Sequence, residues 1–197
     1  MPFFGTTTLR VATFAMAFMA AAAAPASAAT IIANTERSGD AIDIHASMEL
    51  RADAATAWRV LTDYDRYTEF IPDLRVSRVI ARHGATVTVE QSGDAKFWLF
   101  KMPLNVTFEI NETPPNRLRS HAVAGSLRAL ASSYALTPAA HGVRLDYSGR
   151  ITPGFAWFGH FEQIVVEQNI ARQFEAFADE IERQGAAARQ HSDAGSH

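Results

Sequence analysis

Apolar and polar side chains alternate along the chain from residue 41 to residue 51. The apolar positions of this stretch are Ile42, Ile44, Ala46, Met48 and Leu50. Because successive side chains of a strand point to opposite faces, the period of two predicts a strand with one buried and one solvent-exposed face. Asp53 has a side chain suited to cap a helix, so we expect a short helix from Ala54 to about Asp63. A second short helical turn should end before Pro72.

Strand patterns dominate the middle of the chain. Runs rich in β-branched and aromatic residues are separated by Gly, Pro and Asn, which favour turns. The predicted strands cover residues 74–82, 86–91, 97–110, 117–123, 127–137 and 143–151, with one of the turns at residues 92–94. Pro103 lies inside the longest strand, where it indicates a kink, a bulge or an edge position.

The pattern becomes helical after Gly154. From Trp157 to Gln184 apolar residues recur at steps of three and four, which predicts one long amphipathic helix. Gly185 is expected to end this helix, and residues 185–197 are expected to form a disordered tail. Strand, two short helices, six strands and one long helix make an α+β fold. A long helix beside a curved sheet can leave space for a ligand between the two.

The first 28 residues have the pattern of a secretory signal peptide. A start with one Arg precedes a largely apolar run from Val11 to Ala24, and Ala26-Ser27-Ala28 matches a cleavage site. A membrane anchor is the alternative, but the run is shorter than the roughly 20 residues that span a bilayer. We therefore expect cleavage after residue 28 or 29 and export across the inner membrane to the periplasm. A flexible linker should cover residues 29–40, and one domain should cover residues 41–184.

Composition excludes several classes of protein. The formal net charge of -3 argues against nucleic-acid binding, which needs clustered Lys and Arg. The absence of Cys excludes disulfides, zinc–thiolate sites, iron–sulfur clusters and a thiol nucleophile. The seven His show no helical metal-binding pair with a third ligand nearby, and no hydrolase or phosphate-binding motif is present. The sequence thus predicts no metal and no cofactor, and it identifies no catalytic residue.

Several segments resemble a known family. They are AWRVLTDYDRY at residues 57–67, FIP at 70–72, RVSRV at 75–79, YALTP at 134–138 and GVRLDY at 142–147. They resemble the START-like (SRPBCC) superfamily, most closely its polyketide cyclase/dehydrase and coenzyme Q-binding branch, over residues 42–183. The resemblance implies a helix-grip fold, in which a curved antiparallel sheet wraps around the C-terminal helix and encloses an apolar cavity. Members bind lipids, quinones, sterols or polyketides, and a minority catalyse ring closure or dehydration.

Strand parity and the helical period select the side chains expected to line this cavity. From the strands they are Val89, Phe100, Leu104, Val106, Phe108, Tyr134, Leu145 and Tyr147. From the helix they are Phe161, Ile164, Val165, Gln168 and Phe174. Gln168 is polar among apolar neighbours, so it could orient a ligand carbonyl or bond a buried backbone group.

In two clusters of mainly aromatic residues, the apolar side chains do not alternate with polar ones. The first contains Phe97, Trp98 and Leu99, and the second contains Phe155, Trp157 and Phe158. Both could be core, or they could form a hydrophobic rim at the cavity mouth that transiently touches a membrane. An acidic stretch from Asp63 to Asp73 is interleaved with Arg, and we interpret it as an ion-pair surface rather than an acid–base site.

The sequence thus predicts an exported protein that binds a hydrophobic small molecule. The first alternative is a cyclase or dehydratase acting on an aromatic or polyketide substrate. The second is an accessory protein that docks through the aromatic rim. An acid–base pair inside the cavity would favour the enzyme, and a purely apolar lining would favour the binding protein.

Overall fold

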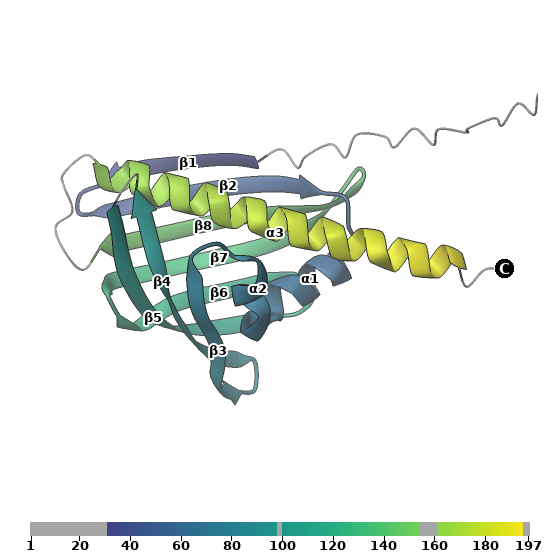
Figure 1. Cartoon of the computed structure of the whole chain (residues 1–197), viewed down its shortest axis with the longest axis horizontal. Coiled ribbons are helices and arrows are strands. Elements are labelled where there is room, and N and C mark those ends of the chain that lie inside the picture. The colour runs from purple at the N-terminus through teal and green to yellow at the C-terminus, as the bar shows by residue number, and fades with distance from the viewer. Residues whose placement is uncertain (1–30, 98–99, 154–160, 195–197) are drawn as a thin grey trace, which may run out of the picture.

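The computed structural model describes residues 31–97, 100–153 and 161–194, and the side chains of residues 97, 100, 161, 162, 193 and 194 are not part of this description. Eight strands form one antiparallel sheet in the order β1-β2-β8-β7-β6-β5-β4-β3 (Figure 1). The strands are β1 (Ile31–Ser38), β2 (Ala41–Leu50), β3 (Leu74–His83), β4 (Thr86–Phe97), β5 (Phe100–Thr113), β6 (Arg117–Gly125), β7 (Leu127–Ala139) and β8 (Gly142–Pro153).

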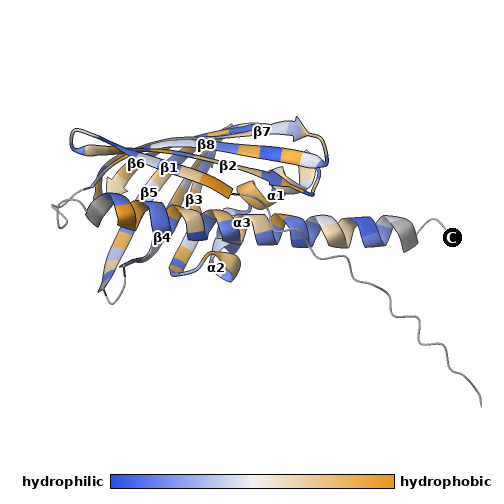
Figure 2. Cartoon of the chain, turned by 90° about the horizontal axis from the view of Figure 1, so that it is seen from above, coloured by the Kyte–Doolittle hydropathy of each residue, from blue (hydrophilic) through white to orange (hydrophobic). Residues whose placement is uncertain are grey.

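Helices lie on one side of this sheet. The long helix α3 (Phe161–Ala194) crosses the sheet, and α1 (Ala54–Thr62), the single turn η1 (Tyr64–Arg66) and α2 (Tyr67–Phe70) connect β2 to β3. Figure 2 shows how hydrophobic and hydrophilic residues alternate along the strands and along α3. The predicted α+β helix-grip fold is confirmed by this arrangement. No helix in the described ranges is both long and apolar enough to cross a membrane.

Helix α1 begins where the sequence predicts. The Asp53 carboxylate accepts a hydrogen bond of 2.6 Å from the backbone N–H of Thr56, and this bond keeps the pKa of Asp53 below its ordinary value. Such a cap satisfies a backbone donor that has no partner within the helix. Helix α1 buries Ala57, Val60 and Leu61 against the sheet, as its apolar stripe indicates.

The strand β1 differs from the linker expected over residues 29–40. Ile31, Ala33 and Thr35 are half-buried and alternate with exposed residues, and β1 pairs with β2 from Ile31↔Met48 to Ser38↔Ala41. The side chain of Gln163 on α3 donates a hydrogen bond of 2.7 Å to the main-chain oxygen of Thr35. Five of the eight residues of β1 are exposed, and Ile31 and Ala33 are the two that pack against the hydrophobic core, so this edge strand carries a weak sequence signal and its composition resembles that of a linker.

The expected turn at residues 92–94 is instead part of β4. A Cβ atom on Gly93 would lie 2.5 Å from the main-chain oxygen of Asp73, which belongs to the loop between α2 and β3. Gly93 therefore permits a close approach of two backbones rather than a change of chain direction.

Helix α3 also continues beyond the expected stop at Gly185 and reaches Ala194. A Cβ atom on Gly185 would lie 2.9 Å from the Cβ atom of Ala52, so this glycine lets α3 pack closely on the start of α1. Arg189, one turn later, donates a hydrogen bond of 2.8 Å to the main-chain oxygen of Arg51. These contacts keep residues 185–194 helical, although their sequence alone indicates a disordered tail.

The core fills one end of the space between α3 and the sheet. Phe174, Phe177 and Ile181 on α3 are at most 1% exposed. Tyr67 and Phe177 meet with their ring centroids 5.2 Å apart, and Tyr147 and Phe174 meet at 5.4 Å. The middle of α3 is thus packed against aromatic side chains, which leaves the remaining space under the turns that precede Phe174.

Candidate ligand-binding site

A cleft opens between the N-terminal half of α3 and the concave face of the sheet. Its outer part has a volume of about 230 Å³ and its inner part a volume of about 120 Å³. Both parts are lined by Leu104, Leu130, Ile151, Asn169 and Ile170, so they adjoin each other. Each volume lies below the roughly 300 to 1,000 Å³ of typical small-molecule pockets.

The inner part of the cleft is apolar. Asn169 and Tyr147 are its polar lining residues in the described part of the chain, and its remaining residues carry only hydrocarbon side chains. The hydrogen-bond donors of the Asn169 side chain already have partners within the protein, because its amide donates to the main-chain oxygens of Val165 at 2.6 Å and Lys96 at 3.2 Å. The lining therefore favours the hydrocarbon part of a ligand.

Charged side chains gather at the mouth of the cleft. The Asp73 carboxylate forms ion pairs with Lys96 on β4 and, at 3.8 Å, with Arg172 on α3. Arg172 also donates hydrogen bonds of 2.7 Å to the Asn169 side chain and of 3.4 Å to the main-chain oxygen of Lys96. These contacts join α3, β4 and the α2–β3 loop in a polar bridge across the mouth.

The loop is held against β4 by its backbone as well. Asp73 has a φ of 67°, in the left-handed region that Asp tolerates better than most residues. Its main-chain oxygen accepts a hydrogen bond of 3.0 Å from the N–H of Asp94, whose carboxylate pairs with Arg75. Both the main chain and the side chain of Asp73 thus hold the α2–β3 loop against β4 at the cleft mouth.

Aromatic residues form the wall between cleft and core. The ring centroids of Tyr134 and Tyr147, which face each other across β7 and β8, are 4.8 Å apart, and the Phe174 ring lies 6.4 Å from that of Tyr134. Burial raises the pKa of both tyrosines, to about 12 for Tyr147. Both side chains are therefore neutral at physiological pH.

A second polar group lies at the far end of β5. The Tyr64 hydroxyl donates a hydrogen bond of 3.1 Å to Glu112, which also forms an ion pair of 3.1 Å with Arg82. Burial, with the adjacent Glu112 carboxylate, raises the pKa of the Tyr64 hydroxyl. None of these three residues lines either part of the cleft, so the group stabilises the fold.

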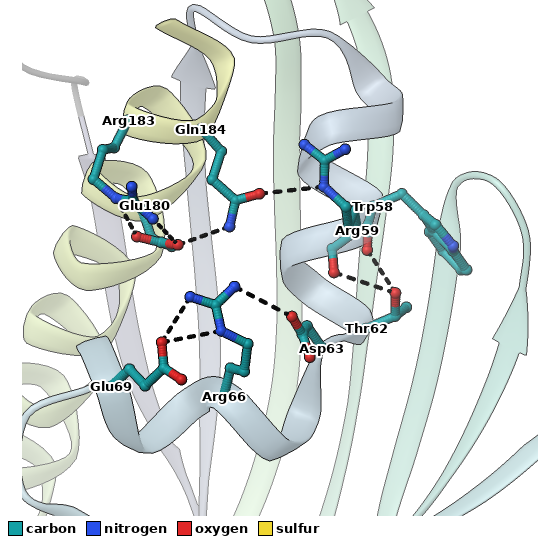
Figure 3. A network of polar contacts seen from close by, with 9 residues as sticks. All are labelled: Trp58, Arg59, Thr62, Asp63, Arg66, Glu69, Glu180, Arg183 and Gln184. Atoms are coloured by element: carbon teal, nitrogen blue, oxygen red, sulfur yellow. Dashed lines mark hydrogen bonds and ion pairs between the residues drawn. The ribbon is translucent and has the colours of Figure 1, made fainter. Parts of the chain in front are cut away.

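The acidic stretch forms ion pairs, as the sequence analysis expects. Figure 3 shows Arg66 between Glu69, at 2.6 Å, and Asp63, at 3.6 Å. On α3 the Glu180 carboxylate accepts hydrogen bonds of 2.7 Å from both Arg183 and Gln184, and Gln184 accepts one of 3.2 Å from Arg59 on α1. Arg59 and Gln184 thus tie α1 to α3, and Arg66 joins Asp63 at the end of α1 to Glu69 on α2. None of the nine residues drawn lines the cleft.

The structure places the predicted site residues in different environments. Leu104, Val106, Phe108, Tyr147 and Val165 line the cleft. Val89, Leu145 and Phe174 are fully buried in the core, and Tyr134 packs against it. Ile164 is 43% exposed and Gln168 is exposed, and neither lines the cleft. The Phe97, Phe100 and Phe161 side chains, and the residues Trp98, Leu99, Phe155, Trp157 and Phe158, lie outside the description.

The sequence pattern does not predict several other residues that line the cleft. Val166 and Ile170 line the cleft from α3, on a face of the helix turned slightly from the one expected. Leu127 and Leu130 line it from β7, on either side of a register shift in the pairing with β8. The shift breaks the alternation on which strand parity depends. Ile151 follows the alternation of β8, so the sequence signal for it was present.

The described residues contain no group of three His, Asp or Glu side chains that could hold a metal ion. The two acidic residues that line the outer cleft, Asp73 and Asp94, both form ion pairs with basic side chains. What the cleft offers chemically is an apolar interior, a neutral tyrosine hydroxyl and a charged mouth.

A family model described as polyketide cyclase / dehydrase and lipid transport matches residues 50–178 of the chain. No curated protein sequence matches. Similar solved structures include a STAR-related lipid transfer protein fragment from Xanthomonas axonopodis, 15% identical with a TM-score of 0.65, covering 81% of this chain and 96% of that one.

Two further similar structures share this fold. One is the Zhui aromatase/cyclase from Streptomyces sp. R1128, 13% identical with a TM-score of 0.58, covering 79% of this chain and 95% of that one. The other is a START superfamily protein from Mycobacterium smegmatis, 10% identical with a TM-score of 0.59, covering 78% of this chain and 98% of that one. At these identities the likeness establishes the fold.

Proposed function

The chain belongs to the polyketide cyclase / dehydrase and lipid transport family, and from this premise we propose that it binds one hydrophobic small molecule in the cleft under α3. The observation that carries the proposal is the inner cleft, whose described lining residues have hydrocarbon side chains except for Asn169 and Tyr147. Burial of apolar ligand surface there is worth about 25 cal/mol per Å² before the costs of association. The ligand is lipid-like, quinone-like or polyketide-like.

The charged residues of the cleft favour binding over catalysis, because they form ion pairs with other charged residues. A general acid or base must reach the reacting atoms in a suitable protonation state. Asp73 and Arg172 line the outer cleft but pair with each other, and Asp94 pairs with Arg75. Among the described residues the inner cleft is lined by no ionisable group other than Tyr147. The lipid transfer protein among the similar structures supports the same choice, whereas the aromatase/cyclase supports the alternative.

Export completes the proposal. The signal-like pattern of residues 1–28 supports secretion to the periplasm, where a binding protein carries or sequesters its ligand across an aqueous space. The test is the intact mass of the protein recovered from the periplasmic fraction of a Gram-negative host that expresses the full chain. A mass equal to that of a chain starting at residue 29 or 30 supports export. A full-length protein recovered from the cytoplasm contradicts it.

The binding proposal is tested by native mass spectrometry of the purified protein, with extraction of whatever travels with it. Leu104→Trp adds volume inside the cleft, and Ile80→Trp places the same side chain at a 51% exposed position as the matched control. We expect a stoichiometric hydrophobic ligand in the wild type and in Ile80→Trp, and its loss in Leu104→Trp. A wild-type protein that is empty and takes up no added lipid contradicts the proposal.

A further inference from the structure

Hydroxyl groups from three strands meet on the concave face of the sheet. Ser120 on β6 lies directly opposite Ser132 on β7, and their hydroxyl oxygens are 2.7 Å apart. Ser132 in turn interacts with the hydroxyl of Tyr147 on β8, and its hydrogen bond partly offsets the burial that raises the pKa of Tyr147. The three residues form a polar strip on this face.

A glycine fixes the position of the Tyr147 hydroxyl. A Cβ atom on Gly149 would lie 2.5 Å from the hydroxyl oxygen and 2.8 Å from the ring carbon that bears it. The tyrosine side chain therefore lies along its own strand, over Gly149 and in the direction of Ile151. Gly149 pairs with Ile44 on β2 and with Ser132 on β7. Since Ile44 and Ile151 both line the inner cleft, the hydroxyl lies at the wall of that space.

The chemistry of this position is that of a neutral donor. Tyr147 is 7% exposed and stays protonated at physiological pH. Among the described residues, Ser132 is the side chain that forms a hydrogen bond with this hydroxyl. A hydroxyl both donates and accepts, so the tyrosine proton can be donated to a ligand when Ser132 donates to the tyrosine oxygen.

We propose that the Tyr147 hydroxyl, seated over Gly149 and held by Ser132 and Ser120, binds an uncharged acceptor, a carbonyl oxygen, on the hydrophobic ligand. This inference rests on the proposed function, because it specifies the ligand of the same cleft. A carboxylate is disfavoured at this depth, since the described residues of the inner lining include no cation to compensate for its lost hydration. A pure hydrocarbon would bind but leave the donor without a partner.

The test compares two probes that share a ring skeleton, 2-methyl-1,4-naphthoquinone and 2-methylnaphthalene. Their dissociation constants are measured by displacement of a neutral fluorescent probe, N-phenyl-1-naphthylamine. We expect the wild type to prefer the quinone by about three- to tenfold, the range of one net hydrogen bond. Tyr147→Phe should reduce this preference to near unity, and the hydrocarbon should bind this variant at least as tightly as the wild type, because no donor is left without a partner.

Matched serine variants provide the control. Ser132→Ala removes a hydroxyl on the concave face, whereas Ser133→Ala removes one that bonds Ser148 at 2.9 Å on the opposite face. Ser132→Ala should weaken the preference, and Ser133→Ala should keep it. A preference that survives Tyr147→Phe, or a wild type with equal affinities, overturns the inference and leaves the proposed function standing. A wild type that binds neither probe overturns both.

A second measurement needs no variant. The infrared carbonyl stretch of ¹³C-labelled quinone bound to the wild type should lie below its frequency in an alkane solvent, because the carbonyl accepts a hydrogen bond. A frequency equal to that in alkane overturns the inference even if Tyr147→Phe does not fold.

Discussion

The main-chain oxygen of Asp73 lies 2.5 Å from the place where a Cβ atom on Gly93 would stand. The loop between α2 and β3 therefore rests directly on the backbone of β4. This close approach brings the Asp73 carboxylate to Lys96 and Arg172, the two cations at the cleft mouth. One glycine thus positions the polar bridge between the sheet and α3.

Gly93→Ala should destabilise the protein by about 1–3 kcal/mol, because the added methyl group forces two backbones apart. The measurement is the free energy of unfolding from urea denaturation. Ser92→Ala is the control on the same strand, and we expect it to change this free energy by less than about 0.5 kcal/mol. Equal effects of the two substitutions would show that the loop does not rest on β4.

Asp73→Asn should accelerate ligand release more than it lowers stability. The substitution removes the carboxylate that both Lys96 and Arg172 approach at the mouth, and these cations are 35% and 39% exposed. Exposed ion pairs contribute at most about 1 kcal/mol each, so the loss of stability should be small. Dissociation of a bound fluorescent probe is measured by stopped flow. Asp146→Asn removes the partner of Arg144, away from the mouth, and should leave the rate unchanged.

Stability should fall at acidic pH through Glu180. Hydrogen bonds from Arg183 hold the pKa of Glu180 below its ordinary value of 4.5. A carboxylate whose pKa is depressed in the folded state contributes stability above its unfolded pKa, and this contribution is lost as the pH falls through the folded pKa. We expect an unfolding free energy that is level near neutral pH and declines below about pH 4.5.

The contribution of Glu180 is isolated by substitution. Glu180→Gln should lower stability at pH 7 and flatten part of the decline, as followed by urea denaturation across pH 3–7. Glu175→Gln, at an exposed position of the same helix, is the control and should retain the wild-type profile. A Glu180→Gln profile parallel to that of the wild type would mean that another carboxylate is responsible.

Two substitutions on α3 test which face of the helix is buried. Phe174 is fully buried, whereas Ile164 is 43% exposed, although both are apolar and were expected on one face. Phe174→Ala should cost about 3–5 kcal/mol of unfolding free energy, the range for a large buried side chain. Ile164→Ala should cost less than about 0.5 kcal/mol. A larger loss for Ile164→Ala would mean that the helix is rotated relative to the structure.

The cleft residues show which parts of the site a local sequence pattern can predict. Leu104, Val106 and Phe108 alternate along β5, and strand parity alone places them on the face that lines the cleft. Parity could not select Leu127 and Leu130, because a register shift interrupts the alternation of β7. On α3 the apolar residues are spaced such that more than one face fits a helical period. Packing against the sheet decides that Val166 and Ile170, rather than Ile164, contact the cleft.

Three glycines show the same limit. Gly93 and Gly185 have the sequence signals of a turn and a helix stop, and Gly149 lies within a predicted strand, but all three serve as close contacts, with Asp73, Ala52 and Tyr147 respectively. The contacts of Gly93 and Gly185 join residues that are distant along the chain, and the absence of a Cβ atom does not indicate which group approaches. The hydroxyl strip of Ser120, Ser132 and Tyr147 likewise depends on the register of three strands.

By itself the sequence determined the order and type of the elements from β2 to α3, the α+β class and the apolar face of most strands, because these follow from periods of two and 3.6 residues within single segments. The tertiary structure decided which face of α3 meets the sheet, that α3 continues past Gly185, and that residues 31–38 form an edge strand. It also decided where the core is filled and where a cleft remains. Those outcomes depend on contacts between distant segments, which the pattern within any one segment cannot specify.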